Sequence, residues 1–345
     1  MRGRANEWFK SYLSNRLQYV SVNGFHSKNE VMKYGVPQGL VLGPLLFLIY
    51  INDLRNAIYH STVHHFADDT NLLYVNKNLK TIQNKINKDL KSLCTWLRAN
   101  KISLNASKTE LIIFRDPRKK ISYDMNIKID GKKILPCSSV KYLEIYIDCH
   151  LNWNTQLAEL KPKLSRAVGM LCKIRHFVDK DTLRMVYYGI FSSILSYGAQ
   201  IWGQHNSVSK KLQVLQNKAL RIMHFVPPRT SASPLLKLSN ILKFNDLVNL
   251  QNFLYAHDSL KDALPSALRG KLDILDHNHE TRLVSANVQL KRPRSNTILY
   301  GSKSIINKSI DIWNSINNNQ PNVMFLEKSR AVCKSSIKKT FLSNY

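Results

Sequence analysis

The clearest periodic pattern along the chain lies in residues 78–99. Its apolar residues recur at spacings of three and four, which is typical of an amphipathic helix. They are Leu79, Ile82, Ile86, Leu90, Leu93 and Leu97. Asn100 follows as a suitable C-terminal stop. We therefore expect a helix over 78–99 with one buried stripe.

The pattern before this helix is mixed. Residues 5–22 change from helical spacing to alternation before Asn23-Gly24, which predicts a helix, a strand and a turn. The apolar run 40–51 predicts a buried helix. Residues 62–75 combine β-preferring flanks with Ala67-Asp68-Asp69, which predicts two strands joined by a tight turn.

Residues 100–150 favour strands again. Short strands are expected at 109–114, 125–129 and 140–147, with a turn at Asp130-Gly131. We therefore expect residues 1–150 to form a mixed α+β domain with a small antiparallel sheet.

After Trp153 the apolar spacing becomes helical throughout. Pro227-Pro228 marks a linker. The expected helices cover about 157–177, 181–197, 208–224, 235–263, 302–318 and 327–343. This predicts three domains: 1–150, an all-α domain over 151–226, and a helical C-terminal region over 227–345.

Charge adds a partner class to this picture. The chain has 51 Lys+Arg against 23 Asp+Glu, a formal charge of +28. Such a surface favours a polyanion, with nucleic acid first and an anionic membrane surface second. The helix at 157–177 carries basic residues between its apolar positions. They are Lys161, Lys163, Arg166, Lys173 and Arg175. This helix face could lie on a phosphate backbone or simply be solvated.

Cysteine usage and hydropathy bear on the compartment. The five cysteines are far apart and do not form C-x-x-C pairs, which favours a reducing environment over a disulfide framework. The apolar run at 40–51 is too short to span a membrane. No secretory signal is recognisable. We expect an intracellular protein of the nucleus or cytoplasm, not a secreted or membrane protein.

Two adjacent carboxylates, Asp68 and Asp69, are the first candidates for chemistry. Like charges held close together are costly unless a cation lies between them. Carboxylate oxygens suit Mg²⁺, and paired metal ions assist phosphoryl transfer. The alternative is a solvated turn, because Asp is a common turn residue.

Three further features are weaker. The loop Gly35–Gly39 could present Gln38 to a ligand, or be a structural turn. Lys108 could contact a phosphate, or be a solvated lysine before a strand. His277 and His279 are better explained as solvated loop residues than as metal ligands.

The order of these features resembles the reverse transcriptase of non-LTR retrotransposons of the LINE type, in particular the jockey-like group. The resemblance extends over nearly the whole chain. It rests on the segments Trp8–Arg16, Gly35-Val36-Pro37-Gln38-Gly39, Tyr50-Ile51-Asn52-Asp53, Phe66-Ala67-Asp68-Asp69, Leu104-Asn105 with Lys108-Thr109, Lys141-Tyr142-Leu143, Tyr197-Gly198-x-x-x-Trp202-Gly203, Gln216–Arg221, Thr281-Arg282 and Ile312-Trp313-Asn314-Ser315.

The resemblance implies a right-hand polymerase with a partial palm over 1–150, a thumb over 151–226 and a C-terminal region over 227–345. It implies an RNA template, a DNA primer and a dNTP as partners, and a two-metal Mg²⁺ site. The implied roles are metal binding by Asp68 and Asp69, nucleotide-phosphate contact or general acid catalysis by Lys108, template and nucleotide binding by Gly35, Pro37, Gln38, Gly39 and Phe66, primer grip by Lys141, Tyr142 and Leu143, and nucleic-acid binding by Lys161, Lys163, Arg166, Lys173 and Arg175.

The resemblance also implies what is missing. Such polymerases have a further catalytic Asp and fingers before the segment matched by Trp8–Arg16. We therefore expect a catalytically incomplete fragment with exposed apolar surface on its palm. Leu40 and Glu144 stand where Ser and Gly are usual. A basic nucleic-acid-binding protein without catalysis is the alternative function, and a carboxylate nuclease is a third. The oligomeric state is left open.

Overall fold

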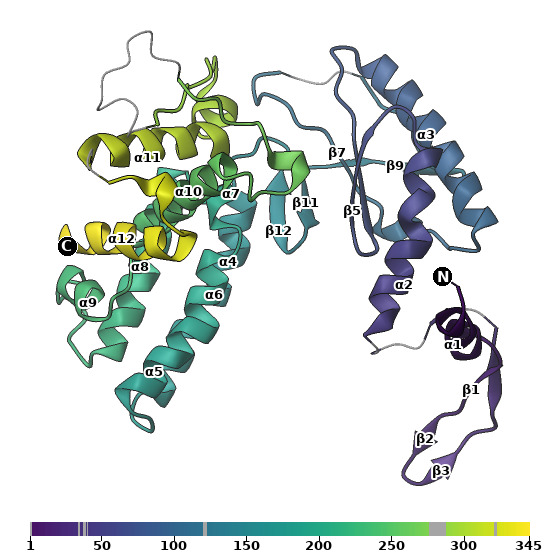
Figure 1. Cartoon of the computed structure of the whole chain (residues 1–345), viewed down its shortest axis with the longest axis horizontal. Coiled ribbons are helices and arrows are strands. Elements are labelled where there is room, and N and C mark those ends of the chain that lie inside the picture. The colour runs from purple at the N-terminus through teal and green to yellow at the C-terminus, as the bar shows by residue number, and fades with distance from the viewer. Residues whose placement is uncertain are drawn as a thin grey trace. The chain divides into compact units, whose positions relative to one another are not determined.

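The computed structural model of the chain divides into two compact units (Figure 1). Unit 1 comprises Met1–Leu111 and Ile121–Leu135, and unit 2 comprises Ile112–Lys120 and Pro136–Tyr345. The structure describes residues 2–33, 35, 36, 39, 41–119, 123–275, 288–320 and 323–345. The expected mixture of helices and small antiparallel sheets is confirmed.

Unit 1 combines three helices with strand pairs among its described residues. The helices are α1 (Arg4–Leu13), α2 (Leu42–Ile51) and α3 (Leu79–Ala99). The strands are β1 (Arg16–Gln18), β2 (Ser21–Val22), β3 (Phe25–His26), β4 (Glu30–Met32), β5 (Thr62–Phe66), β6 (Asp69–Leu73), β8 (Ile127–Ile129) and β9 (Lys132–Ile134), and β7 (Leu111–Ile112) lies where the two units join. They form separate two-stranded ladders, so the prediction of one small antiparallel sheet over residues 1–150 is wrong for the described residues.

Helix α3 provides the core of unit 1. The Asn78 side chain caps its N-terminus by accepting from the Lys80 and Thr81 amides at 2.9 and 3.3 Å. The predicted stripe is buried over its C-terminal half, and it packs against β8, whose Ile127 and Ile129 are also buried. The prediction of a helix over 78–99 is confirmed.

The prediction that the apolar segment 40–51 is buried is wrong for its described residues. Only Gly43 and Ile51 of α2 are buried, while Leu45 and Ile49 are 53% and 58% exposed. The helix is apolar all round, so no arrangement that packs one side can cover it. Large apolar residues are also exposed on α1 and on the strands that follow it. This confirms the prediction of exposed apolar surface; what covers it stays a prediction.

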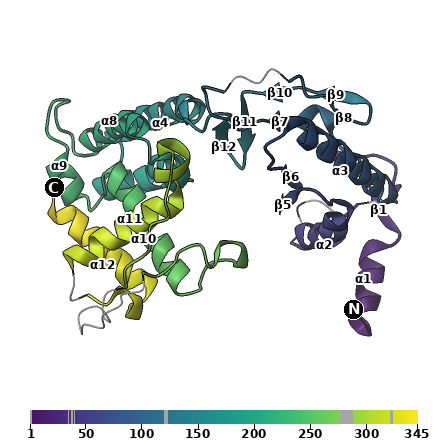
Figure 2. The ribbon, with the colours of Figure 1, turned by 90° about the horizontal axis from the view of Figure 1, so that it is seen from above.

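Unit 2 is helical apart from short strands, as expected. Its strands are β10 (Pro136–Cys137), β11 (Ser139–Tyr142) and β12 (Ile145–Asp148). Its helices are α4 (Asn154–Ile174), α5 (Lys180–Val186), α6 (Ser193–Ser196), α7 (Ala199–Trp202), α8 (Asn206–Met223), α9 (Ser233–Leu238), α10 (Phe244–Leu260), α11 (Ile305–Asn319) and α12 (Arg330–Ser343), with a π-helical turn at Tyr187–Ser192 between α5 and α6. Helices α4 and α8 lie side by side (Figure 2).

Two predicted elements of unit 2 are divided in the structure. The strand expected at 140–147 is a hairpin, because Leu143 and Glu144 take left-handed conformations and reverse the chain. The helix expected over 235–263 is interrupted at Asn240, which is also left-handed, and resumes as α10. Asn tolerates this region better than most residues, so it suits a break.

Two hydrophobic clusters form the core of unit 2. The first gathers α4 to α8 around Phe191 and Trp202, and the second gathers α10 to α12 around Trp313 and Phe325. Helix α10 belongs to both. Its Phe244 ring stacks on Trp202 with ring centroids 5.5 Å apart, and its Phe253 ring stacks on Trp313 with centroids 5.0 Å apart. The helices before residue 226 and those after it therefore both pack against the buried helix α10.

Candidate active site

The β5–β6 hairpin carries the two candidate metal-binding carboxylates. Phe66 pairs with Asp69 across the ladder, so Ala67 and Asp68 form the tight turn. Ala67 takes a left-handed conformation, which lets the chain reverse over two residues. Asp68 thus lies in the turn and Asp69 opens β6. The two carboxylates are brought together at one end of the hairpin, as predicted.

Both carboxylates are free to meet a ligand. Asp68 and Asp69 are exposed, and neither side chain accepts a hydrogen bond or pairs with a cation among the described residues. Hard carboxylate oxygens at adjacent positions fit the chemistry that Mg²⁺ requires. Within the described ranges, no group of three or more His, Cys, Asp or Glu residues is placed to hold a metal ion. The hairpin therefore offers two ligands from one side.

A buried carboxylate that the sequence analysis missed fixes this hairpin. Asp89 of α3 is 1% exposed. It accepts hydrogen bonds from the amides of Tyr59 and His60, at 3.2 and 3.0 Å, and from the Tyr74 hydroxyl at 3.0 Å. These donors lie just before β5 and just after β6. One side chain thus holds both ends of the hairpin on α3.

The signal for Asp89 was present in the pattern. It lies three residues after Ile86 and directly before Leu90, inside the apolar stripe of a helix whose solvent face is basic. A carboxylate at such a position needs donors, because an unpaired buried charge is costly. Burial raises the pKa of Tyr74 well above its usual value, and the nearby Asp89 adds to that shift. Tyr74 therefore stays a neutral donor.

The other predicted nucleotide contacts are described only in part. Lys108 is exposed at the end of a 3₁₀ turn, Ala106–Lys108, that Asn105 caps. Within the described residues, Lys108 makes no ion pair with Asp68 or Asp69, and Phe66 is exposed beside the turn. Gly35 and Gly39 have φ values of +77° and +80°, as a tight glycine loop requires. The remaining predicted positions lie outside the described residues: Pro37, Gln38, Leu40, His277, His279, Thr281 and Arg282.

The predicted primer grip belongs to the β11–β12 hairpin of unit 2. Lys141 and Tyr142 lie in β11, and Leu143 with Glu144 forms the turn. The Lys141 Nζ atom lies 2.6 Å from Glu144 Oε1. This hydrogen-bonded ion pair raises the pKa of Lys141 and lowers the pKa of Glu144. The one cation of the predicted grip is therefore paired with a carboxylate of its own turn.

A second motif fastens this hairpin to the helices. The Tyr197 hydroxyl donates to the Leu143 carbonyl at 2.8 Å, and the Trp202 indole donates to the Tyr197 carbonyl at 3.1 Å. Gly198 has a φ of +60°, and a Cβ there would collide with Cδ1 of Ile145 in β12. Only glycine fits this contact without strain. The segment Tyr197–Trp202 thus positions the hairpin, a role that resemblance alone did not reveal.

Replacing Glu144 with glycine is expected to raise the stability of unit 2 and its affinity for anions. A left-handed residue with a side chain costs roughly 1 kcal/mol more than glycine, so the free energy of unfolding should rise by about that amount. Lys141 also loses its partner and becomes available to phosphate. Urea denaturation and the affinity for a labelled RNA oligonucleotide measure the two effects.

Glu144→Gln separates these effects, because it removes the ion pair but keeps the left-handed side chain. We expect it to raise RNA affinity without raising stability. A glycine variant that unfolds more easily than the original chain would contradict the role given to this turn.

Four of the five predicted basic residues lie on α4, but not on one face, and the fifth, Arg175, directly follows the helix. Arg166 and Lys173, seven residues apart, share the solvent side, and Lys161 and Lys163 lie on opposite flanks of the buried stripe. Arg175 is half-buried beside the Phe225 ring, with Cζ 5.5 Å from the ring centroid. In the described part of the chain none of the five forms an ion pair.

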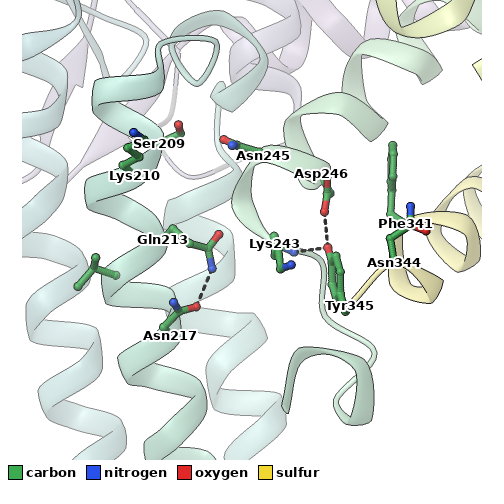
Figure 3. A pocket seen from close by; sticks show the side chains of 11 residues that line it. Ser209, Lys210, Gln213, Asn217, Lys243, Asn245, Asp246, Phe341, Asn344 and Tyr345 are labelled. Atoms are coloured by element: carbon green, nitrogen blue, oxygen red, sulfur yellow. Dashed lines mark hydrogen bonds between the residues drawn. The ribbon is translucent and has the colours of Figure 1, made fainter. Parts of the chain in front are cut away.

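A separate pocket of about 590 Å³ lies in unit 2 between α8, the start of α10 and the end of α12 (Figure 3). The Tyr345 hydroxyl donates to Asp246 at 2.6 Å and accepts from the Lys243 amide at 2.7 Å. Gln213 donates to Asn217 at 2.7 Å. Its polar groups largely bond one another, and none of the predicted site residues lines it.

Comparison with known proteins finds a family match over the segment that contains this hairpin. Residues 2–147 match the family described as "Reverse transcriptase (RNA-dependent DNA polymerase)". This matched part of the chain contains the Asp68-Asp69 hairpin and is similar to the reverse transcriptase family. The resemblance stated from the motifs is confirmed.

Three of the similar proteins are named as polymerases of mobile elements of Drosophila melanogaster. The chain is 32% identical over 234 residues to "Probable RNA-directed DNA polymerase from transposon BS", a match that covers 63% of the chain and 25% of that protein. It is 24% identical to "RNA-directed DNA polymerase from mobile element jockey", over 76% of the chain and 29% of the relative. It is 26% identical to "Probable RNA-directed DNA polymerase from transposon X-element", over 83% of the chain and 30% of that relative.

These matches span less than a third of each relative's own length. Matching segments of two relatives extend past the family domain into unit 2, because they cover three quarters or more of the chain. As for membranes, the described helices include none with the length and apolar character needed to cross a bilayer.

Proposed function

We propose that the chain is the palm, thumb and C-terminal part of an RNA-directed DNA polymerase of a non-LTR retrotransposon. The palm part is residues 1–150, the thumb is 151–226, and the C-terminal region is 227–345. The observation that carries the proposal is the Asp68-Asp69 pair, exposed and unpartnered at the end of a hairpin that Asp89 holds in place. It lies inside the segment that matches the family.

The reaction of the longer polymerase is template-directed nucleotidyl transfer. The 3′-hydroxyl of a DNA primer loses its proton to solvent, its oxygen bonds to the α-phosphorus of a dNTP, the bond from that phosphorus to the bridging oxygen breaks, and pyrophosphate leaves. Bound Mg²⁺ ions would activate the hydroxyl and stabilise the leaving oxygen. Asp68 and Asp69 would hold this metal, and Lys108 would contact the nucleotide phosphates.

The remaining proposed contacts orient the nucleic acid. Gln38, which lies between Gly35 and Gly39 in the sequence, would contact the templating base pair, with Phe66 beside the carboxylates. The turn of the β11–β12 hairpin would contact the primer end through Tyr142 and Leu143. The unpaired cations of α4 would follow the phosphate backbone of an RNA template paired with its DNA primer.

Catalysis by paired metals requires carboxylates on two sides of the site. The described residues bring together two, from a single hairpin. We therefore expect the 345-residue chain by itself to extend a primer poorly or not at all. In the longer polymerase, a further carboxylate would complete the site.

The proposal is tested by primer extension on an RNA template with Mg²⁺, together with binding of the template–primer. Binding should weaken steeply with salt, because phosphate contacts release counterions. Any extension should vanish in Asp68→Ala and in Asp69→Ala. Asp53→Ala removes an exposed carboxylate of the same unit and serves as the matched control.

The possible outcomes separate the parts of the proposal. Extension that survives both Asp68→Ala and Asp69→Ala would exclude the hairpin as the catalytic centre. Robust extension that these variants abolish would confirm the centre and show that the chain is complete enough to act. Salt-independent binding would exclude the nucleic-acid interface.

A second candidate is a nucleic-acid-binding protein without catalysis. The unpaired cations Arg166 and Lys173 on the solvent side of α4 favour it, because they need no metal to bind phosphate. This candidate predicts salt-sensitive binding of RNA that Asp68→Ala leaves unchanged, with no extension under any metal condition. Adding Mn²⁺ in place of Mg²⁺ to the extension assay tests the second half of that statement.

A further inference from the structure

The end of unit 2 formed by the α4–α5 turn and the end of α8 carries two exposed phenylalanines. Phe177, in the turn, is 86% exposed, and Phe225, just after α8, is 46% exposed. Arg175 lies over the Phe225 ring, and the His176 ring meets it edge-on with centroids 5.8 Å apart. We call these four residues the aromatic tip.

The charge around the aromatic tip is mainly positive. Lys173 precedes it on α4, and Lys180 and Arg184 follow it on α5, all exposed. Within the described residues none of these three forms an ion pair, whereas Asp179 is occupied in capping α5 by accepting from the Thr182 amide at 2.6 Å. Exposed aromatic rings among unpaired cations are the combination that binds unpaired bases and their phosphates.

The backbone at Phe225 is strained for a phenylalanine. Helix α8 ends in a Schellman motif, with the Phe225 amide donating to Ile222 and the Val226 amide to Arg221. The motif places Phe225 at φ +55°, a left-handed position where glycine is usual. A bulky residue there is unfavourable for folding. Local backbone strain of this kind occurs at ligand-binding sites as well as at structural turns.

A protein partner would fit this surface less well. Exposed apolar side chains alone would suit one, but the tip sets a guanidinium directly over a ring and surrounds both with cations on a chain of charge +28. A nucleotide offers the π face of its base to the ring and its phosphate to the cations at the same time. Paired bases in a duplex do not expose that face.

We propose that the aromatic tip binds single-stranded nucleic acid by stacking unpaired bases on Phe177 and Phe225, with Arg175 and Lys180 contacting the flanking phosphates. This inference deepens the proposed function, because it rests on nucleic-acid binding by unit 2. It assigns unpaired strand to the tip, separately from the duplex along α4.

The strain at Phe225 allows binding to be separated from folding. Phe225→Gly removes the ring and relaxes the left-handed position, so it should weaken binding while leaving thermal stability equal or higher. Phe177→Leu keeps an apolar side chain but removes the ring, and Phe177→Tyr keeps the ring. Because Phe177 is almost fully exposed, neither change should disturb the fold.

The test measures fluorescence polarisation of the full chain with a labelled oligouridylate, an oligothymidylate and a duplex of equal length. We expect Phe177→Leu and Phe225→Gly each to weaken binding of the single strands by about tenfold, the size of one base–aromatic stack. Duplex affinity should change less than about twofold, and Phe177→Tyr should match the original chain. The RNA and DNA arms show which strand the tip prefers.

Each result bears on one of the two proposals. Single-strand affinity that is unchanged in both ring-less variants, with duplex binding intact, overturns the aromatic tip and leaves the proposed function standing. Equal losses for duplex and single strand overturn the assignment of unpaired bases to the tip. Absence of all nucleic-acid binding by the original chain overturns both.

Discussion

Replacing Asp89 with alanine is expected to lower the free energy of unfolding of unit 1 by about 3 kcal/mol and to loosen the β5–β6 hairpin. The change leaves three donors without their acceptor: the amides of Tyr59 and His60 and the Tyr74 hydroxyl. A buried donor that loses its partner costs about 1–3 kcal/mol. Water that enters the gap can bond some of these donors and recover part of the lost free energy. The total cost is therefore less than three times the cost of one unpaired donor.

Hydrogen exchange measured by mass spectrometry locates the effect. Peptides that contain β5 and β6 should exchange faster in Asp89→Ala, because both ends of the hairpin are released. Asp89→Asn keeps an acceptor oxygen and should be intermediate. Lys88→Ala changes the exposed neighbour and serves as the control. Unchanged protection of the hairpin in Asp89→Ala would show that the ladder positions the carboxylates without help from α3.

Replacing Trp313 with alanine is expected to destabilise unit 2 by about 4 kcal/mol, the usual cost of emptying a large aromatic site in a core. Trp313 is buried, stacks on Phe253 of α10, and donates its indole hydrogen to the Val288 carbonyl at 2.8 Å. Because α10 also contributes Phe244 to the first cluster, the loss should spread to α8.

Urea denaturation followed by circular dichroism measures the total change, and hydrogen exchange in α8 measures its spread. Trp313→Phe keeps part of the ring contact and should cost less. Met324→Ala, at an exposed position beside the second cluster, should have little effect. If α8 keeps its protection while α11 and α12 lose theirs, the two clusters unfold independently, as the predicted boundary at residue 226 requires.

The helices were largely predictable from apolar spacing. The stripe over 78–99 and the spacing after Trp153 correspond to α3 and α4, because a single buried face repeats every three to four residues along each helix. Turns with a glycine partner, Asn23-Gly24 and Asp130-Gly131, were also predictable, since both residues of each turn take positive φ values.

Burial and chain reversal without glycine were not predictable. The apolar run that forms α2 indicates burial, yet what would cover it is not among its packed neighbours. The reversal at Leu143-Glu144 carries no glycine, so the alternation around it is the pattern of one continuous strand. In both cases tertiary contacts, rather than local preference, decide the outcome.

The placement of the two candidate carboxylates in a hairpin turn was predictable, but the contacts that hold the hairpin were not. Adjacent carboxylates between β-preferring residues identify Asp68 and Asp69. The residues that hold the two hairpins, Asp89 and Tyr197, act through contacts with segments 15 to 54 positions away. The spacing of residues along the chain does not indicate which distant residues make such hydrogen bonds.

The sharing of α10 between the clusters has a consequence for damaged gene copies. A stop codon after residue 226 would remove Phe244 as well as the last helices, and Trp202 would lose the ring that covers it. The upstream helices would then present an open apolar face, which favours aggregation and removal by proteases. A chain that ends after residue 226 would therefore be degraded rather than accumulate as a smaller folded protein.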